Sequence, residues 1–142
     1  MAAYVKYEKF TEDLARGVHD FDAHTFCVAL TNTAPNVATH TVRADIIELA
    51  TGSGYTQDSH TSTISISRTG GTTTVDATDV AFTSSGTIGP FRYAVLYNTT
   101  PISPVDPLIC YWDYGSNISI TSGNTFTVDI GAGTGNDLFT LA

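Results

Sequence analysis

The sequence predicts an all-β fold, a jelly-roll-like β-sandwich of about eight strands with one short N-terminal helix. Residues 91–98 and 108–114 carry bulky or β-branched side chains at nearly every position, which is typical of strands buried on both faces. Shorter runs alternate apolar and polar residues between clusters of turn formers. Charged residues make up 14% of the 142 residues, below the roughly 25% usual in soluble domains. Threonine and serine take their place, which suits outward positions of a sheet and a surface that packs against other proteins.

The first 22 residues are expected to form an N-terminal arm with a short helix over residues 7–17. One helical face is marked by apolar residues three and four positions apart: Tyr7, Phe10, Leu14 and Val18. Glu12 and Arg16 form a favourable i,i+4 pair, and Gly17 can end the helix in the left-handed conformation. Residues 23–142 are expected to form a single β-sandwich domain.

The first half of that domain alternates strands with one long loop. Residues 25–31 alternate regularly and predict a strand that ends near Pro35. Residues 36–61 are expected to form a long loop with a small helix at 44–48. Two strands, 63–67 and 72–76, flank the hairpin signal Gly70-Gly71.

The second half contains the two apolar strands and several shorter ones. Residues 79–83 predict a short strand, and the loop between the two apolar strands is stiffened by Pro101, Pro104 and Pro107. Residues 117–121 and 125–130 are expected to pair with each other around a turn at 122–124. An apolar tail, residues 138–141, closes the chain.

Charge and hydropathy argue against nucleic acid and membrane as partners. The formal net charge is −8, and only six Lys or Arg residues are present. Gripping duplex DNA commonly takes about 6–10 phosphate contacts, and this chain cannot assemble that many basic residues on one face. No stretch approaches the ~20 apolar residues that a membrane span needs. The N-terminus lacks the apolar run of a secretory signal, so we expect synthesis in the cytoplasm.

Two cysteines, Cys27 and Cys110, lie inside strand-like runs. Buried free thiols that pack as small apolar side chains are the favoured interpretation. A disulfide between two strands is the alternative, and it would require an oxidising compartment.

The residues that could support chemistry form no convincing site. The glycine-rich run 131–136 lacks the helix that must follow a phosphate-binding loop, so a turn is expected. Folding could bring His19 and His24 together for a metal, but solvated loop residues are favoured. Asp113 beside Trp112 is the acid of most interest for glycosidase chemistry, and an outward residue near the strand end is the favoured reading. We therefore expect no enzymatic activity, no metal and no cofactor.

Tyr111 and Trp112 are adjacent in a strand and so point to opposite faces. Packing in the core is favoured for both. If one of them were displayed, it would suit sugar binding or an interface anchor.

Three segments carry a resemblance to a known group of proteins: residues 28–35 (VALTNTAP), 88–98 (IGPFRYAVLYN) and 111–116 (YWDYGS). With the helical opening and the closing residues 126–129, they resemble small virion proteins of tailed bacteriophages over most of the chain. The resemblance implies a capsid decoration or cement protein, a β-sandwich bound outside the head. It transfers no individual functional residues.

That resemblance implies the virion surface as the location, the major capsid protein as partner and self-association as a dimer or trimer. We expect the N-terminal segment to reach the capsid subunit through Tyr4, Lys6, Tyr7, Lys9 and Phe10. A tail or receptor-binding component is one alternative, and a carbohydrate-binding β-sandwich module is another.

Overall fold

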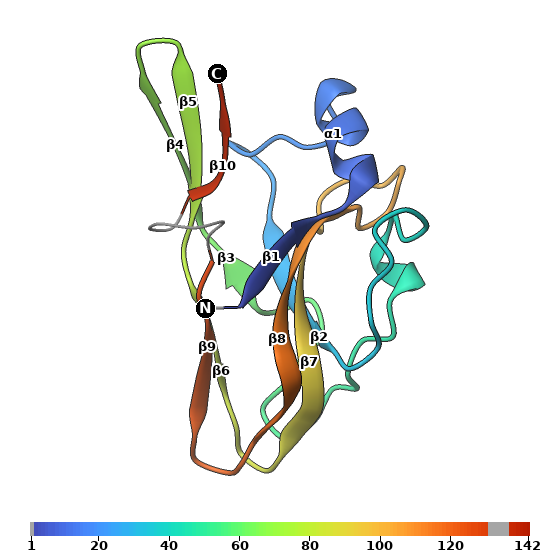
Figure 1. The fold of residues 1–142 in the computed structure, drawn as a ribbon. Helices are drawn as coiled ribbons and strands as arrows, with labels where there is room; N and C mark the ends of the chain where they lie inside the picture. The colour runs from blue at the N-terminus through green and yellow to red at the C-terminus, as the bar shows by residue number, and fades with distance from the viewer. Residues whose placement is uncertain (1, 131–136) are drawn as a thin grey trace.

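The computed structural model describes residues 2–130 and 137–142, and its fold is an all-β sandwich (Figure 1). Ten antiparallel strands and one α-helix are found in these residues. The predicted fold class is confirmed. The glycine-rich run 131–136 lies outside the described residues.

One layer is a five-stranded sheet with the order β1-β8-β7-β2-β3. Its strands are β1 (Ala3–Lys6), β2 (Phe26–Thr31), β3 (Thr61–Ser62), β7 (Ile88–Asn98) and β8 (Leu108–Ile120). The two strands expected from the apolar runs, β7 and β8, are neighbours, and β7 lies at the centre. All six residues of β2 are buried, because β2 has packed side chains on both faces.

The other layer consists of two smaller sheets that lie along the same side of the large sheet in Figure 1. The three-stranded sheet has the order β10-β5-β4, with β4 (Ile64–Thr69), β5 (Thr72–Ala77) and β10 (Asp137–Leu141). The two-stranded sheet pairs β6 (Val80–Thr83) with β9 (Thr125–Val128). The hairpin expected at Gly70-Gly71 joins β4 to β5 as predicted.

The expected pairing of residues 117–121 with 125–130 is wrong. Strand β8 continues to Ile120, which pairs with Ile88 of β7. Strand β9 turns away and pairs with β6, placing Phe126 opposite Phe82. The end of β8 stays hydrogen-bonded to β7. The short turn after β8 therefore leads into the other layer, where β9 finds its partner.

Buried side chains form two clusters, one on each face of the five-stranded sheet. The larger cluster lies between the layers and includes Phe26, Leu96 and Cys110. The smaller one lies on the opposite face and includes Cys27 and Tyr97. Both cysteines are free and buried, as favoured from the sequence. They belong to different faces of the sheet, so the alternative of a disulfide does not hold.

The N-terminal segment is part of the sandwich. Strand β1 pairs with β8 in a regular antiparallel register, and helix α1 (Glu8–Ala15) follows directly. The helix ends as predicted: Gly17 has φ +75°, and the amides of Gly17 and Val18 donate to the carbonyls of Leu14 and Asp13. The small helix expected at 44–48 is a 3₁₀ turn, η1 (Arg43–Asp45).

Candidate interaction surfaces

The N-terminal segment presents an edge of the large sheet. Strand β1 is the last strand on its side, and Tyr4 lies opposite Trp112 with an edge-to-face ring contact of 5.9 Å. Tyr4 is half-buried by this contact, whereas Lys6 at the end of the strand is exposed. No acidic side chain in the described part of the chain forms an ion pair with Lys6.

Two of the five residues expected at the capsid interface are core residues, which corrects that expectation. Tyr7 has no exposed surface and Phe10 is 2% exposed. The Tyr7 amide donates to the Ile109 carbonyl at 3.1 Å, and the Tyr7 ring packs against Tyr111. Phe10 packs against Phe139 of the opposite layer. The helix lies against the sheet, so its apolar face is already covered.

Lys9 is held within the helix. Its Nζ contacts Asp13 Oδ1 at 2.6 Å and Glu12 Oε2 at 3.3 Å. The hydrogen bond to Asp13 raises the pKa of Lys9 above its ordinary value. The same contact gives a cationic partner to the Asp13 carboxylate, which is only 2% exposed. Tyr4, Lys6 and Lys9 stay predicted interface residues.

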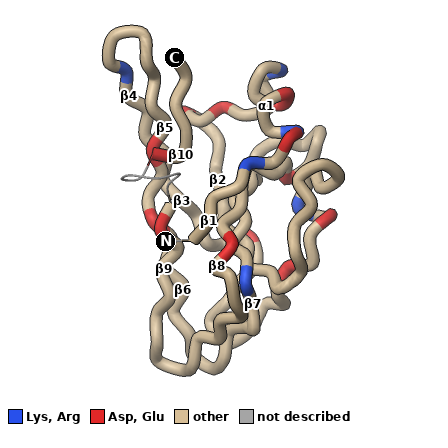
Figure 2. Tube along the Cα trace, viewed as in Figure 1, with Lys and Arg blue, Asp and Glu red and all other residues tan. Residues whose placement is uncertain are grey.

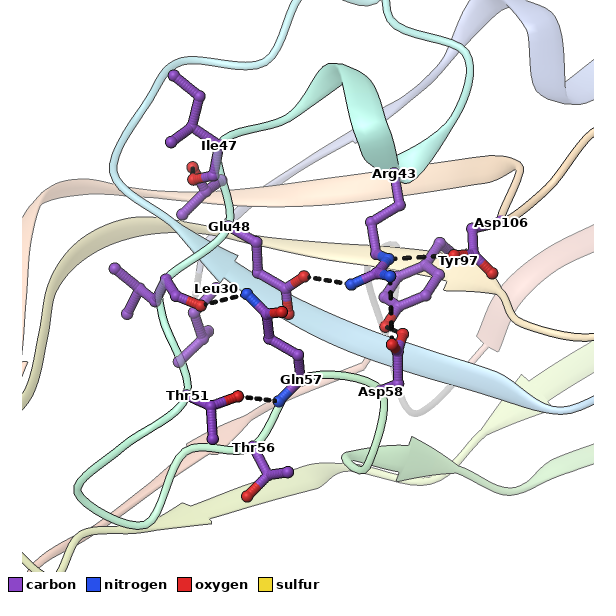
Figure 3. A network of polar contacts seen from close by, with 12 residues as sticks. Leu30, Arg43, Ile47, Glu48, Thr51, Thr56, Gln57, Asp58, Tyr97 and Asp106 are labelled. Carbon is purple, nitrogen blue, oxygen red and sulfur yellow. Dashed lines mark hydrogen bonds and ion pairs between the residues drawn. The ribbon is translucent and has the colours of Figure 1, made fainter.

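A second polar assembly, centred on Arg43, lies over the outer face of the large sheet (Figure 3). Each nitrogen of the guanidinium group contacts a different carboxylate: Nη1 lies 2.7 Å from Glu48, Nη2 3.2 Å from Asp58 and Nε 3.2 Å from Asp106. The guanidinium carbon lies 5.4 Å from the centre of the Tyr97 ring. One cation therefore joins two loops to the central strand β7.

Two buried tyrosines complete this assembly. The Tyr97 hydroxyl donates to Asp58 at 2.6 Å, and the Tyr55 hydroxyl donates to Glu48 at 2.5 Å. Tyr55 also accepts a hydrogen bond from the Leu30 amide. Burial, reinforced by these carboxylates, raises the pKa of both tyrosines well above the ordinary value. The hydroxyls therefore stay protonated and act as fixed donors that lock the loops to the sheet.

A pocket of about 500 Å³ lies beside Arg43. Val105 lines the pocket and is 60% exposed, and Ile102, its partner in a β-bridge, is 89% exposed. Asp106 fixes this proline-rich loop because it binds Arg43. The loop therefore presents two apolar side chains on a rigid support, a feature of contact surfaces.

His19 and His24 converge on one residue of the large sheet, as the metal-site alternative required. The Asn98 side-chain nitrogen lies 3.1 Å from His19 Nδ1 and 2.9 Å from His24 Nδ1. His19 is 6% exposed, which corrects the expectation of a solvated loop residue. Burial lowers its pKa to about 4, against a smaller opposing effect of Asp13. Among residues 2–130 and 137–142, no group of three His, Cys, Asp or Glu side chains is arranged to hold a metal ion.

Asp113 forms an ion pair with Arg92 on the adjacent strand β7. Its carboxylate accepts two hydrogen bonds from Arg92, at 2.7 and 2.9 Å, and one from the Gly115 amide. The bond to Arg92 lowers the pKa of Asp113. The carboxylate thus supports the strand pair β7–β8.

The aromatic pair on β8 is divided as strand geometry requires. Trp112 is 1% exposed in the main core, as favoured from the sequence. Tyr111, on the other face, is half-buried and packs edge to face with Tyr7 and Tyr93. Trp112 is therefore not available as a platform for a sugar ring.

The Arg43 assembly is not evident from the sequence. Its carboxylates lie 5, 15 and 63 residues from Arg43 in the chain, so no local spacing connects them. Only Arg43 itself gave a signal, as one of six basic residues in an acidic chain.

No protein-family model, no curated protein and no solved structure matches this chain. No helix in the described part is long and apolar enough to cross a membrane.

Proposed function

We propose that this protein is a structural component of a phage virion, a decoration or cement protein that binds the outside of the head. It would stabilise the shell through protein–protein contacts with the major capsid protein and would have no catalytic role. The proposal rests on the resemblance to small virion proteins inferred from the sequences of residues 28–35, 88–98 and 111–116.

These three segments lie next to one another in the fold. They fall on β2, β7 and β8, three adjacent strands of the five-stranded sheet, and on the turn after β2. Some side chains are of types that can take part in catalysis or metal binding. In this structure they make contacts that hold the scaffold together: Arg43, Asp113 and His19. Such a scaffold suits a protein that must remain rigid while its surface adheres to neighbours.

The edge formed by β1 is the surface we propose for the capsid contact. An edge strand offers free backbone donors and acceptors to an added strand. Lys6 adds an exposed positive charge at the end of this edge, while Tyr4 is partly accessible. Several contacts of modest strength, repeated over a symmetric shell, would act together through avidity.

Binding to capsids that lack this protein tests the proposal. The wild-type chain should co-sediment with such capsids, and Lys6→Glu should weaken binding because it reverses the exposed charge. Arg16→Glu is the matched control, since Arg16 is exposed at the far end of α1. Equal binding of Lys6→Glu and wild type would exclude the β1 edge.

The position of this protein on the phage particle distinguishes a decoration protein of the head from a component of the tail. Density for the sandwich on the capsid surface in an electron-microscopy reconstruction would support a decoration protein. Density confined to the tail or its fibres would instead favour a tail or receptor-binding component.

A further inference from the structure

We propose that the outer edge of β4 pairs with β4 of a second copy of this chain. The two strands would run antiparallel and be symmetric about Ile66, joining two three-stranded sheets into one sheet of six strands. This inference goes beyond the proposed function, because the pairing needs only the purified chain.

Strand β4 is a regular and unprotected sheet edge. It is the last strand of the order β10-β5-β4, and no described strand pairs with its outer side. Its six residues pair with β5 without a register shift, and five of them are exposed. Natural edges usually carry charged side chains that reach outward, above all lysine, or proline or a bulge, and these block further pairing. β4 has none of these, and the Arg68 guanidinium turns back to donate to the Gly70 carbonyl at 2.7 Å.

The register with β5 determines which backbone groups are free. Thr69 and Thr72 flank a two-residue turn, so they form a hydrogen-bonded pair, and such pairs alternate along the hairpin. The Thr78 amide donates to the Thr63 carbonyl, which extends the same alternation past the strand. The amides and carbonyls of Ile64, Ile66 and Arg68 therefore point away from β5.

Symmetry about Ile66 uses all of these free groups. In an antiparallel pair centred there, Ile66 faces its own copy and Ile64 faces Arg68 of the second copy. Each of these pairs joins residues whose backbone groups point outward, so each can exchange two hydrogen bonds. A pair centred on Ser67 would leave Ile64 outside this pattern.

An apolar row ends at this edge. Phe139 pairs with Val75 and Val75 pairs with Ile66, so the three side chains lie in line on one face of the sheet. Val75 is 3% exposed, whereas Ile66 is 47% exposed. Pairing about Ile66 would continue the row into the second copy and cover the exposed part of Ile66.

The local charge permits a second copy to approach despite the net charge of −8. Between residues 64 and 75 the hairpin carries only Arg68 (Figure 2). In the symmetric register the two Arg68 residues would be separated by four positions along the strands, about 13 Å. Asp76 lies opposite Ser65 on β5, one strand away from the contact.

Sedimentation equilibrium of the purified chain tests the pairing. The mean mass should rise with concentration from 15.1 kDa towards twice that value. Ile66→Lys should abolish the rise, because it places a charge at the centre of the contact. Ile47→Lys is the matched control, since it makes the same change at a residue that is 69% exposed and lies outside the hairpin, and it should associate like wild type. A mass that stays at the monomer value, or equal association of Ile66→Lys and wild type, would overturn the inference.

Cross-linking tests the register. Both native cysteines are buried, so a single introduced cysteine can be linked selectively in the native protein. Ile66→Cys should give covalent dimers with a short thiol cross-linker, whereas Arg68→Cys should give far fewer. Efficient linking at position 68 alone, or assemblies that grow beyond the dimer as β4-to-β10 pairing would produce, would contradict the symmetric pair. Neither result would bear on capsid binding, which the Lys6 experiment measures separately.

Discussion

Arg43 joins two loops to the central sheet with one guanidinium group. We expect Arg43→Met to lower the free energy of unfolding by about 3 kcal/mol, because Glu48 and Asp106 would remain largely buried without a cation. Arg43→Lys should restore only part of the loss, since an ammonium group cannot reach three carboxylates in the same plane. Urea denaturation measures both.

The control for this prediction is Arg68→Met. Arg68 is exposed and contacts only its own turn in the described structure, so its loss should change stability little. Similar effects at the two positions would show that the Arg43 assembly contributes little to the fold.

His19 makes stability depend on pH. Its folded pKa of about 4 lies below the ordinary 6.5, so the unfolded chain binds more protons between these values. The contribution is fully present above pH 6.5 and is lost as the pH falls towards 4. A shift of one pKa unit corresponds to about 1.4 kcal/mol, so the loss is at most about 3 kcal/mol.

Unfolding measured across this pH range should show the loss, and His19→Gln should flatten the curve. His60 has a pKa lowered by burial and contributes a slope of the same sign in both proteins. His24 and Asp13 face His19 and are also unchanged in the variant. An identical slope in wild type and His19→Gln would contradict the assignment.

Helices, strands and turns that depend on residues close together in the sequence were predicted correctly. The apolar runs gave β7 and β8, Gly70-Gly71 gave the β4–β5 hairpin, and Gly17 gave the end of α1. The partner of β9 could not be predicted in this way. The turn before β9 is compatible with a return along β8 or a crossing to β6, and contacts distant in sequence, such as Phe82 with Phe126, decide between them.

Gly54 sets how closely the loop before β3 approaches the end of β6. Its φ is +94°, and a Cβ atom there would collide with the Thr83 carbonyl oxygen. We expect Gly54→Ala to destabilise the protein by about 1–3 kcal/mol, through backbone strain and displacement of the loop. Thermal unfolding measures this.

Gly71→Ala provides the comparison. A Cβ at Gly71 would meet no atom within 4 Å, and its φ lies outside the range that favours glycine. Its stability should equal or slightly exceed that of wild type. If both variants unfolded at the same temperature, the close approach at Gly54 would not be a constraint.

In the molecule as a whole, the clusters of polar side chains arise from contacts between parts of the chain that are distant in sequence. Asn98 meets His19 and His24 from 79 and 74 residues away. Alternation predicted which side chains of a strand share a face, but it could not predict which loops cover that face. Tyr7 and Phe10 show this limit: their helical spacing was found, but the sheet that covers them was not evident from sequence.

The two cysteines report on the integrity of the sandwich, because they lie on opposite faces of one sheet. Burial raises the pKa of Cys27 to about 11 and that of Cys110 well above its ordinary value, so neither forms the reactive thiolate at neutral pH. We expect the native protein to resist a thiol reagent and to gain two labels per chain in denaturant, as mass spectrometry would show. Because each face must open for its cysteine to react, both labels should appear together across the unfolding transition. Rapid labelling of Cys27 alone in the native state would mean that the loops over the outer face open without the rest of the fold.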